Sequence, residues 1–341
     1  MATTTYGLDI SKRVFQMYWI EDETGEFANR RFNKQQLIEF LGLRQTGRVA
    51  LEACGSAHWW ARKIAALGHT VVLLHARFIR PFVQNNKTDA TDARAIWTAA
   101  QQPGMRFVAP KTEEQQTMLA LHRMRSLLIK SRTMQVNQLR GLLYEFGVTL
   151  KAGRVAGLTE FREHLPQIEE LMPPTLFCAL GDQLRHISML DDEIKKLERQ
   201  LGVWRRQEDA CRRVAAIPGI GPLTATALVA TIGDPTAFKS GRELAAYLGL
   251  VPRQTGTGGK IRLGGITKRG DSYLRMLLIH GARAVLFKSR RKTAWCEQVL
   301  QRRPVNVAAV ALANKMARTA RAVLAHNRTY QADYEGLKPS M

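Results

Sequence analysis

Short apolar runs fill most of the first hundred residues, with stretches of helical spacing between the later ones. The runs are rich in aromatic and β-branched residues, which favours strands. The predicted strands are 4–10, 14–20, 26–32, 48–53 and 70–75. The predicted helices are 34–43, 57–67 and 89–100. The first three strands make a plausible antiparallel meander, and the order of elements predicts a mixed sheet covered by helices, an α/β fold.

Two long helical stretches follow. The first, 111–146, ends at Gly147 and carries an apolar stripe beside a basic flank, which is either a solvated face or a surface that follows phosphates. In the second, 180–204, apolar residues recur every seven positions, which indicates a coiled-coil seam. The seam residues are Leu180, Ile187, Ile194 and Leu201, with Leu190, Leu197 and Trp204 as the companion series. A lone helix would expose this seam, so it must pack on the 111–146 helix, on another subunit, or on both.

The stretch from Val214 to Ala225 has the pattern of a helix–hairpin–helix motif around a Pro-Gly-Ile-Gly turn. Gly219 and Gly221 permit close approach of the backbone. The N–H groups at the start of the following helix can bind a phosphate without reading its base. The alternative is a plain helical turn that only packs.

A polar, Gly-rich loop is expected over 254–271, followed by helices at 272–287 and 306–324. The loop carries Lys260, Arg262, Lys268 and Arg269, and no acid before Asp271. Such a loop can fold closely around a sugar-phosphate backbone. A flexible linker is the alternative, and the four cations make it the weaker one.

The 341 residues are enough for two or three domains. We expect an α/β domain at 1–108, a helical coiled-coil oligomerisation region at 109–208, and a mainly α-helical C-terminal domain at 209–341. Lys and Arg number 51 against 29 Asp and Glu, a net charge of +22 that favours a polyanionic partner, most simply nucleic acid.

The remaining composition bears on the compartment. The four cysteines have no zinc-site spacing, which favours reduced thiols. No segment approaches the length of a transmembrane helix, and the N-terminus lacks a signal-peptide pattern. We expect a cytoplasmic protein of a bacterium that does not act at a membrane.

Four acids are candidates for a catalytic centre. Asp9 and Glu52 end apolar strands, where ligands of α/β sheets gather. Asp89 and Asp92 lie three apart in the first turn of a helix with Thr88 as its N-cap, so they share one face. Four converging carboxylates need compensation, and two Mg²⁺ ions would make them a phosphoryl-transfer site. For any single acid, a strand-end or capped-helix role is the alternative.

Three short motifs carry a family resemblance. They are Gly7-Leu8-Asp9, Leu51-Glu52-Ala53 and Lys87-Thr88-Asp89-Ala90-Thr91-Asp92-Ala93-Arg94. They resemble the Asp-Glu-Asp-Asp signature of the transposase family usually called insertion sequence one-ten, which includes the Piv-type DNA invertases. The nuclease domain of that family resembles the RuvC Holliday-junction resolvase, of ribonuclease-H type. The resemblance implies that the metal ligands are Asp9, Glu52, Asp89 and Asp92.

The C-terminal part resembles the second signature of the same family. The stretch that carries it is the Gly-rich loop followed by Gly270-Asp271-Ser272-Tyr273-Leu274-Arg275. The Gly-Lys-Ile-Arg-Leu-Gly segment brings it closest to the branch called eleven-eleven. In this family a Ser of the loop is thought to attack DNA and to hold a covalent phosphoester.

This chain departs from that pattern, because no Ser lies between Pro252 and Asp271. Counting from Pro252 puts Thr257 at the Ser position, whereas counting back from Gly270 puts Gly256 there. Thr257 has a hydroxyl that could serve as nucleophile. Thr255 is the reserve candidate, and an inactive protein is the remaining alternative.

The resemblance implies a DNA recombinase of an insertion sequence. Its partners would be donor and target DNA, a guide RNA from the element's own noncoding end, and further copies of the chain in dimers that pair into tetramers. Two other hypotheses stay open. A structure-selective endonuclease would need the four acids but would use water as nucleophile, and a non-catalytic nucleic-acid-binding protein would have purely structural acids.

Overall fold

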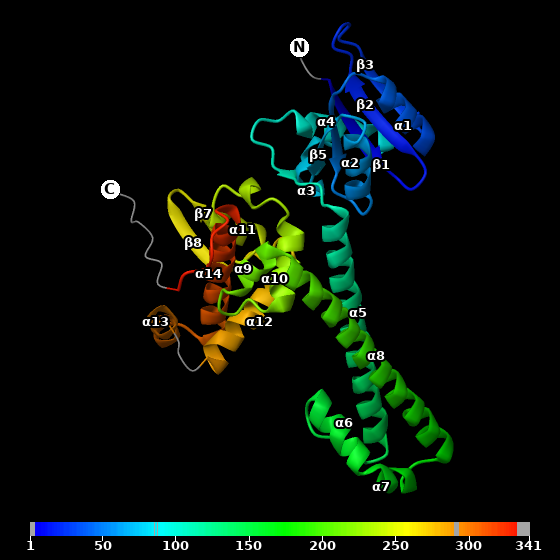
Figure 1. The fold of residues 1–341 in the computed structure, drawn as a ribbon, viewed down its shortest axis with the longest axis vertical. Helices are drawn as coiled ribbons and strands as arrows, with labels where there is room; N and C mark the ends of the chain where they lie inside the picture. The colour runs from blue at the N-terminus through cyan, green and yellow to red at the C-terminus, as the bar shows by residue number, and fades with distance from the viewer. Residues whose placement is uncertain (1–3, 85, 87, 290–292, 333–341) are drawn as a thin grey trace. The chain divides into compact units, whose positions relative to one another are not determined.

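The chain folds into two compact units (Figure 1). The computed structural model describes residues 4–84, 86, 88–289 and 293–332. The first unit comprises Met1–Gln116 and Ile232–Ala237, and the second comprises Thr117–Thr231 and Phe238–Met341. The predicted sheet lies in the first unit and the long helices lie in the second. The three-part division at residues 108 and 208 stays a prediction.

A six-stranded mixed sheet forms the centre of the first unit, in the order β3-β2-β1-β4-β5-β6. Its strands are β1 (Thr5–Ile10), β2 (Phe15–Ile20), β3 (Phe27–Phe32), β4 (Arg48–Glu52), β5 (Thr70–Leu74) and β6 (Phe107–Val108). The first three strands are an antiparallel meander, as predicted, and β4 and β5 run parallel to β1. The edge strand β6 was not predicted, because two residues are too few to show an alternating pattern.

Helices cover both faces of this sheet. They are α1 (Lys34–Leu43), α2 (Ala57–Ala65), α3 (Ala76–Ile79), the 3-10 turn η1 (Arg80–Phe82) and α4 (Asp89–Ala100). Side chains alternate along a strand. Leu8 and Leu51 therefore pack with Trp60 of α2 in one apolar core, whereas Ala50 packs with Ile96 of α4 in another. The mixed α/β fold expected for this part of the chain is confirmed.

An antiparallel pair of long helices dominates the second unit (Figure 1). The pair is α5 (Glu113–Glu145) and α8 (Pro174–Gln207), joined by α6 (Arg154–Glu163) and α7 (Leu165–Glu170). Arg125 of α5 meets Glu198 of α8, and the later Arg132 meets the earlier Asp191, so the two helices run in opposite directions. The predicted seam is buried at Leu180, Ile187, Ile194, Leu197, Leu201 and Trp204. The seam thus packs on the preceding long helix of the same chain.

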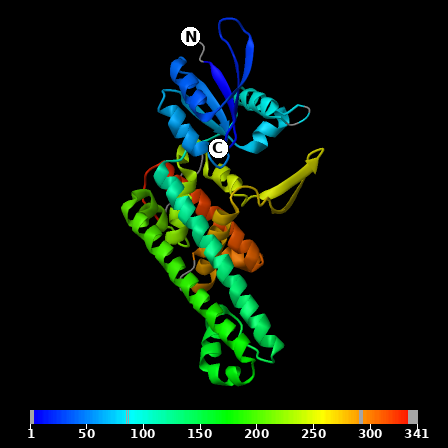
Figure 2. The same ribbon diagram turned by 90° about the vertical axis from the view of Figure 1, so that its right-hand side faces the viewer.

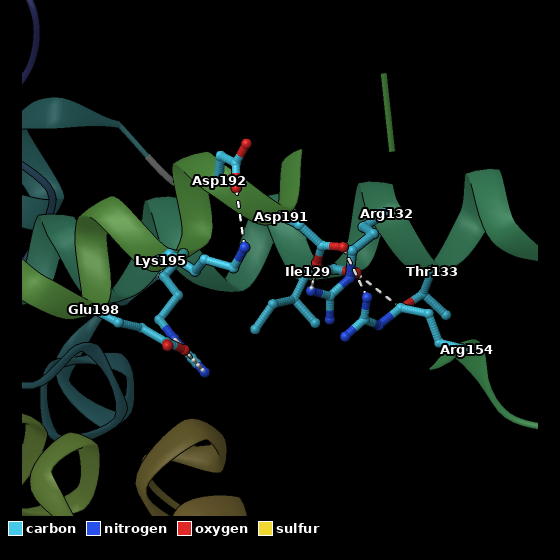
Figure 3. Close-up of polar contacts among 9 residues, drawn as sticks. Ile129, Arg132, Thr133, Arg154, Asp191, Asp192, Lys195 and Glu198 are labelled. Atoms are coloured by element: carbon cyan, nitrogen blue, oxygen red, sulfur yellow. Dashed lines mark hydrogen bonds and ion pairs between the residues drawn. The ribbon is translucent and has the colours of Figure 1, made fainter. Parts of the chain in front are cut away.

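An ion-pair cluster ties α6 to this helix pair (Figure 3). One carboxylate oxygen of Asp191 lies 2.5 Å from a guanidinium nitrogen of Arg132, and the other lies 2.7 Å from one of Arg154. The three side chains come from three helices, because Arg132 belongs to α5, Arg154 to α6 and Asp191 to α8. A single carboxylate therefore makes ion pairs with two helices from a third, beside the apolar core that the three share.

The rest of the second unit is a bundle of shorter helices. They are α9 (Asp209–Ala215), α10 (Pro222–Ile232), α11 (Gly241–Tyr247), α12 (Ser272–Lys288), α13 (Ala294–Arg302) and α14 (Val305–Ala325). A further 3-10 turn, η2 (Pro235–Ala237), belongs to the first unit. The predicted helices at 272–287 and 306–324 are confirmed by α12 and α14, whereas α13 was not predicted.

The segment predicted as a Gly-rich loop is instead largely a β-hairpin, which projects from the helices of its unit (Figure 2). Its strands are β7 (Pro252–Thr257) and β8 (Lys260–Ile266), paired antiparallel. Gly258 and Gly259 form the turn with φ of +56° and +81°. Two consecutive residues with positive φ suit the tight turn of a two-residue hairpin. Gly258 and Gly259 therefore form the turn of a β-hairpin.

Candidate active site and nucleic-acid interface

The sheet places Asp9 and Glu52 on neighbouring parallel strands. Leu8 of β1 pairs with Leu51 of β4, so the residues that follow each of them end the two strands side by side. Adjacent strands are ~5 Å apart. The two acids predicted to end apolar strands therefore lie on adjacent strands.

Both acids point to the face of the sheet that α4 covers. Along β1, Leu8 belongs to the core on the α2 side, so the next residue, Asp9, turns to the opposite face. Along β4, Leu51 and Glu52 alternate in the same way. Helix α4 lies directly on β1, since a Cβ on Gly7 would lie 2.4 Å from the Ala93 carbonyl oxygen. A side chain at position 7 would push α4 off the sheet and away from the acids.

Local hydrogen bonds fix the start of α4. The Thr88 hydroxyl accepts the Thr91 N–H at 3.2 Å, and the Thr91 hydroxyl accepts the Thr88 N–H at 2.9 Å, which is a reciprocal cap. Trp97 anchors the helix to the sheet by donating to the Thr5 carbonyl at 2.9 Å. The cap predicted at Thr88 is confirmed, and Asp89 and Asp92 lie in the first turn. Two residues just before it, Asn85 and Lys87, lie outside the described residues.

The four acids are electrostatically coupled. The pKa of Asp9 is raised to about 6, first because the carboxyl is partly buried and then because the charges of Asp92, Asp89 and Glu52 act on it. Each of the other three acids therefore lies close enough to disfavour ionisation of Asp9. The α4 acids, distant in sequence from Asp9, act on the same carboxyl.

The side chains do not close on a single point. Within the described residues, no three His, Cys, Asp or Glu side chains are grouped so that they could hold a metal ion. Four like charges favour side-chain positions that keep their oxygens apart. The donors are all carboxylate oxygens, which fit a hard divalent cation, and such a cation would relieve the repulsion recorded in the pKa of Asp9.

The hydroxyl candidates for the nucleophile lie on the hairpin of the second unit. Thr257 is opposite Lys260, and Thr255 is opposite Arg262. Residues directly opposite in a ladder share a face, and residues two apart do too. One face of the hairpin therefore presents both threonines together with both cations. Gly256, the position reached by the other way of counting, faces the opposite side.

Lys268 and Arg269 lie in the turn between the hairpin and α12. The Lys268 N–H donates to the Gly249 carbonyl at 3.2 Å, and the Arg269 carbonyl accepts from Arg275 at 2.8 Å. A Cβ on Gly249 would lie 2.2 Å from the Arg269 carbonyl oxygen. The backbone of this turn is thus tightly held, while both of its cationic side chains are exposed to solvent.

The two glycines of the expected helix–hairpin–helix have different surroundings. Gly219 has a φ of +90°, and a Cβ there would lie 2.8 Å from Met316 and 3.0 Å from the Gly281 carbonyl oxygen, so this glycine is needed for packing. Around Gly221, by contrast, a Cβ would meet no heavy atom within 4 Å among the residues described. The open position for a ligand is Gly221, at the start of α10.

Sequence reasoning missed a buried polar chain that joins three helices. The two ring nitrogens of His122 lie 3.0 Å from the hydroxyls of Tyr273 and Thr226. Burial, and secondly the charge of Arg125, lower the pKa of His122 to about 4. The signal available in the sequence was one His within the apolar stripe of a long helix, which does not identify its partners.

No helix in the described part of the chain is both long and apolar enough to cross a bilayer.

Comparison with known proteins agrees with this architecture. Residues 6–147 match the transposase family of the Asp-Glu-Asp-Asp (DEDD) type, and residues 211–296 match the family described as Transposase IS116/IS110/IS902. The four acids lie in the first matched stretch, and Thr257 lies in the second.

Relatives match over nearly the whole chain. The transposase for insertion sequence element IS1328 of Yersinia enterocolitica is 40% identical, over 93% of this chain and 95% of that protein. The transposase for IS1111A of Coxiella burnetii is 39% identical, over 95% of this chain and 90% of that one. The pilin gene-inverting protein of Moraxella lacunata is more distant, at 26% identity over 84% of each chain. The chain therefore belongs to the IS110/IS116/IS902 family of DEDD transposases, enzymes of DNA cleavage and strand transfer.

Proposed function

We propose that this protein moves an insertion sequence by Mg²⁺-dependent strand exchange, with Thr257 as the attacking group. The observation that carries the proposal is the coupling of Asp9 to Glu52, Asp89 and Asp92 at one edge of the sheet. Such coupling of ionisable groups is typical of functional sites. The family accounts for DNA as the substrate, and the four acids account for a divalent metal.

The four carboxylates would hold two Mg²⁺ ions, which would polarise the scissile phosphate and stabilise the leaving oxygen. Asp9 and Glu52 supply the ligands from the sheet, and Asp89 and Asp92 supply those from α4. The rigid strand pairing and the capped helix start keep these ligands in place without a loop. Protonation of Asp9 would remove one ligand, so Mg²⁺ should bind more weakly as the pH falls, because the cation competes with a proton for this carboxylate.

In the proposed step, the Thr257 hydroxyl oxygen forms a bond to phosphorus and loses its proton. The ester bond between phosphorus and a sugar oxygen breaks, and the sugar oxygen takes up a proton as it leaves. The hydroxyl of a second strand can then reverse the step and free Thr257. Lys260 and Arg262, on the same hairpin face, would orient the phosphate by charge.

The test is Thr257→Ala, measured as Mg²⁺-dependent strand transfer on donor and target DNA. Loss of a nucleophile removes nearly all chemistry, so we expect transfer to fall by at least ~10³-fold. Thr257→Ser should retain activity because it keeps the hydroxyl, and Thr255→Ala tests the reserve candidate on the same face, since transfer lost only in that variant would make Thr255 the nucleophile. If the unmodified chain and Thr257→Ala both cleave DNA at the same rate without joining strands, the chain is instead a structure-selective endonuclease that uses water. If Asp9→Asn leaves activity unchanged, the four acids are not the catalytic centre, and only an unmodified chain without any activity would leave the non-catalytic binding protein.

We propose further that a guide RNA selects the DNA sites. The support is a net charge of +22 combined with contact groups, backbone N–H and cationic side chains, that bind phosphates rather than base edges. Sequencing of the nucleic acid that copurifies with the protein would test this. A single RNA species from the noncoding end of the element is the expected result, and random host RNA would contradict it.

Homodimers, and pairs of dimers, are the proposed assembly. The support is a set of heptad-spaced positions on α5, all exposed in the described chain except the half-buried Ser131. They are Ala120, Met124, Leu127, Ser131 and Met134. Met124, Leu127 and Met134 are 55%, 63% and 57% exposed. An a/d spacing on an exposed helix face suits packing against the same helix of a second copy.

A further inference from the structure

A groove lies between the C-terminal half of α8 and the first turn of α10, within the second unit. Its volume is about 1060 Å³. Four cations of α8 line it, Lys195, Arg199, Arg205 and Arg206, and Pro222 and Leu223 of α10 close its far side. This volume exceeds the usual range of small-molecule pockets, ~300–1,000 Å³. An extended ligand suits it better than a metabolite.

The arginines of the groove lack the ion pairs that nearby arginines make. Around it, Arg125 is paired with Glu198 at 2.6 Å, and Arg212 and Arg213 share Asp209. Among the residues that the structure describes, Arg199, Arg205 and Arg206 have no acidic partner. The Nε atom of Arg205 is buried without any hydrogen-bond acceptor. The Nε atom of the ion-paired Arg213 is buried in the same way, so what distinguishes the groove arginines is the absence of an acidic partner.

The acids that line the groove do not cancel this charge. Asp192 is paired with Lys195 at 3.0 Å (Figure 3). Glu198 is engaged by Arg125 on the α5 side. The two carboxylates are therefore occupied, and the excess charge of the groove is positive.

The cations of α8 lie in a row that leads toward the first turn of α10. Lys195, Arg199 and Arg206 are spaced by four and seven residues, so they lie on one face of α8, with the small Gly202 between them. The line is ~16 Å long at 1.5 Å per residue. That length spans about four to five phosphates of one strand at ~3.4 Å of rise each.

The start of α10 supplies neutral donors at the end of this line. The first intrahelical bond runs from the Ala225 N–H to the Gly221 carbonyl, at 2.9 Å. The N–H groups of Leu223 and Thr224 therefore lie before the helical ladder and have no acceptor within it. Such groups bind phosphate oxygens together with the helix dipole.

We propose that this groove binds the phosphodiester backbone of one nucleic-acid strand, held by Arg199, Arg205 and Arg206 and by the first turn of α10. The inference rests on the proposed function for the presence of nucleic acid, but it assigns a surface that neither the four acids nor the hairpin provides. Contacts of this kind read no sequence. The groove therefore anchors a strand and leaves selection to other parts of the complex.

The test is direct binding by the full chain, in EDTA, to labelled duplexes of unrelated sequence, one DNA and one RNA. The variant is Arg199→Ala/Arg205→Ala/Arg206→Ala. Loss of three phosphate contacts should reduce the slope of log affinity against log salt by about 2–3, and should weaken binding at low salt by ~10- to 1,000-fold. If the variant binds only the DNA duplex or only the RNA duplex more weakly, the groove binds that nucleic acid. If it binds both more weakly, the groove binds a phosphodiester backbone of either kind.

The matched control is Arg162→Ala/Arg185→Ala/Lys196→Ala, which removes the same charge from exposed positions outside the groove. Replacing the three groove arginines with lysine should retain most of the slope, because the charge remains. If the triple alanine variant does not fold, Arg199→Ala/Arg206→Ala changes only exposed side chains and should lose about two units of slope.

Unchanged affinity and slope on both duplexes, or an equal loss in the control, overturns the proposal. The measurement needs neither metal nor cleavage, so the Asp9→Asn protein should bind like the unmodified chain. If the groove variant also binds normally while Asp9→Asn abolishes cleavage, the groove assignment fails and the proposed function stands. If Asp9→Asn leaves cleavage intact, the proposed function fails whatever the groove does.

Discussion

Asp9 is the acid of the candidate centre whose pKa is raised by burial and by the charges of the other three acids. Its folded pKa of about 6 exceeds the ordinary value of 3.8, so its stabilising contribution is complete below pH 3.8 and is lost as the pH rises through 6. In EDTA at pH 7.5, Asp9→Asn should therefore raise the unfolding free energy by about 1 kcal/mol, a figure reduced for solvent screening of a partly exposed group. Thermal unfolding measures this, with the exposed Glu23→Gln as control. A variant less stable than the unmodified chain would contradict the coupling.

His122 predicts the opposite dependence on pH. Thr226 donates to the Pro222 carbonyl, so it accepts from Nε2–H of His122, and the other ring nitrogen accepts from Tyr273. The ring is thus neutral, with a pKa of about 4 against 6.5 when unfolded. Its stabilisation is complete above pH 6.5 and is lost as the pH falls from 6.5 through 4, by about 2–3 kcal/mol.

The measurement for His122 compares the unmodified chain with His122→Gln by denaturant unfolding at pH 7 and at pH 4.5. Glutamine cannot take up a proton, so the stability advantage of histidine should narrow over this interval. Taking the difference between the two proteins removes the contribution of Asp9, which has the opposite sign. An advantage that stays constant would mean that His122 does not titrate below its ordinary pKa.

At the scale of elements, strands and caps were predictable because their determinants are local. The cap at Thr88 needs only Thr91, and the alternation along β1 sets the direction of Asp9 once Leu8 is known to be core. The hairpin was missed because the glycine-rich segment was interpreted as a loop folded around a sugar-phosphate backbone, although the Gly258-Gly259 pair is a hairpin signal. The packing role of Gly219 could not be predicted, because Gly281 and Met316 approach it only in the fold.

One carboxylate makes the ion pairs that link α5, α6 and α8. Asp191→Ala would leave Arg132 and Arg154 facing each other without an anion, so we expect a loss of about 1–3 kcal/mol, less than for a fully buried pair. Amide hydrogen exchange should rise in α6 first. The control is Asp182→Ala, which breaks an exposed pair with Arg185 and should cost at most ~1 kcal/mol. Equal effects of the two variants would show that the link between these helices does not depend on Asp191.

At the scale of the whole molecule, the heptad seam of α8 packs within the chain, so a second copy must bind through another surface. The predicted seam of α8 is buried against α5, so it is not available for another subunit. The exposed positions Met124 and Leu127 on α5 are an apolar surface with heptad spacing.

We therefore expect Met124→Lys/Leu127→Lys to convert dimers to monomers, because two lysines in a helix–helix seam bring like charges together across the symmetry axis. Sedimentation velocity at micromolar protein measures this without nucleic acid present. Met189→Lys on α8 is the control, since this methionine is 60% exposed but lies outside the α5 seam. A monomer that keeps its thermal midpoint and its binding to duplex DNA, but loses strand transfer, would place the second copy in the reaction rather than in folding. A variant that remains dimeric would exclude this face of α5, and dimers would then have to form through another surface.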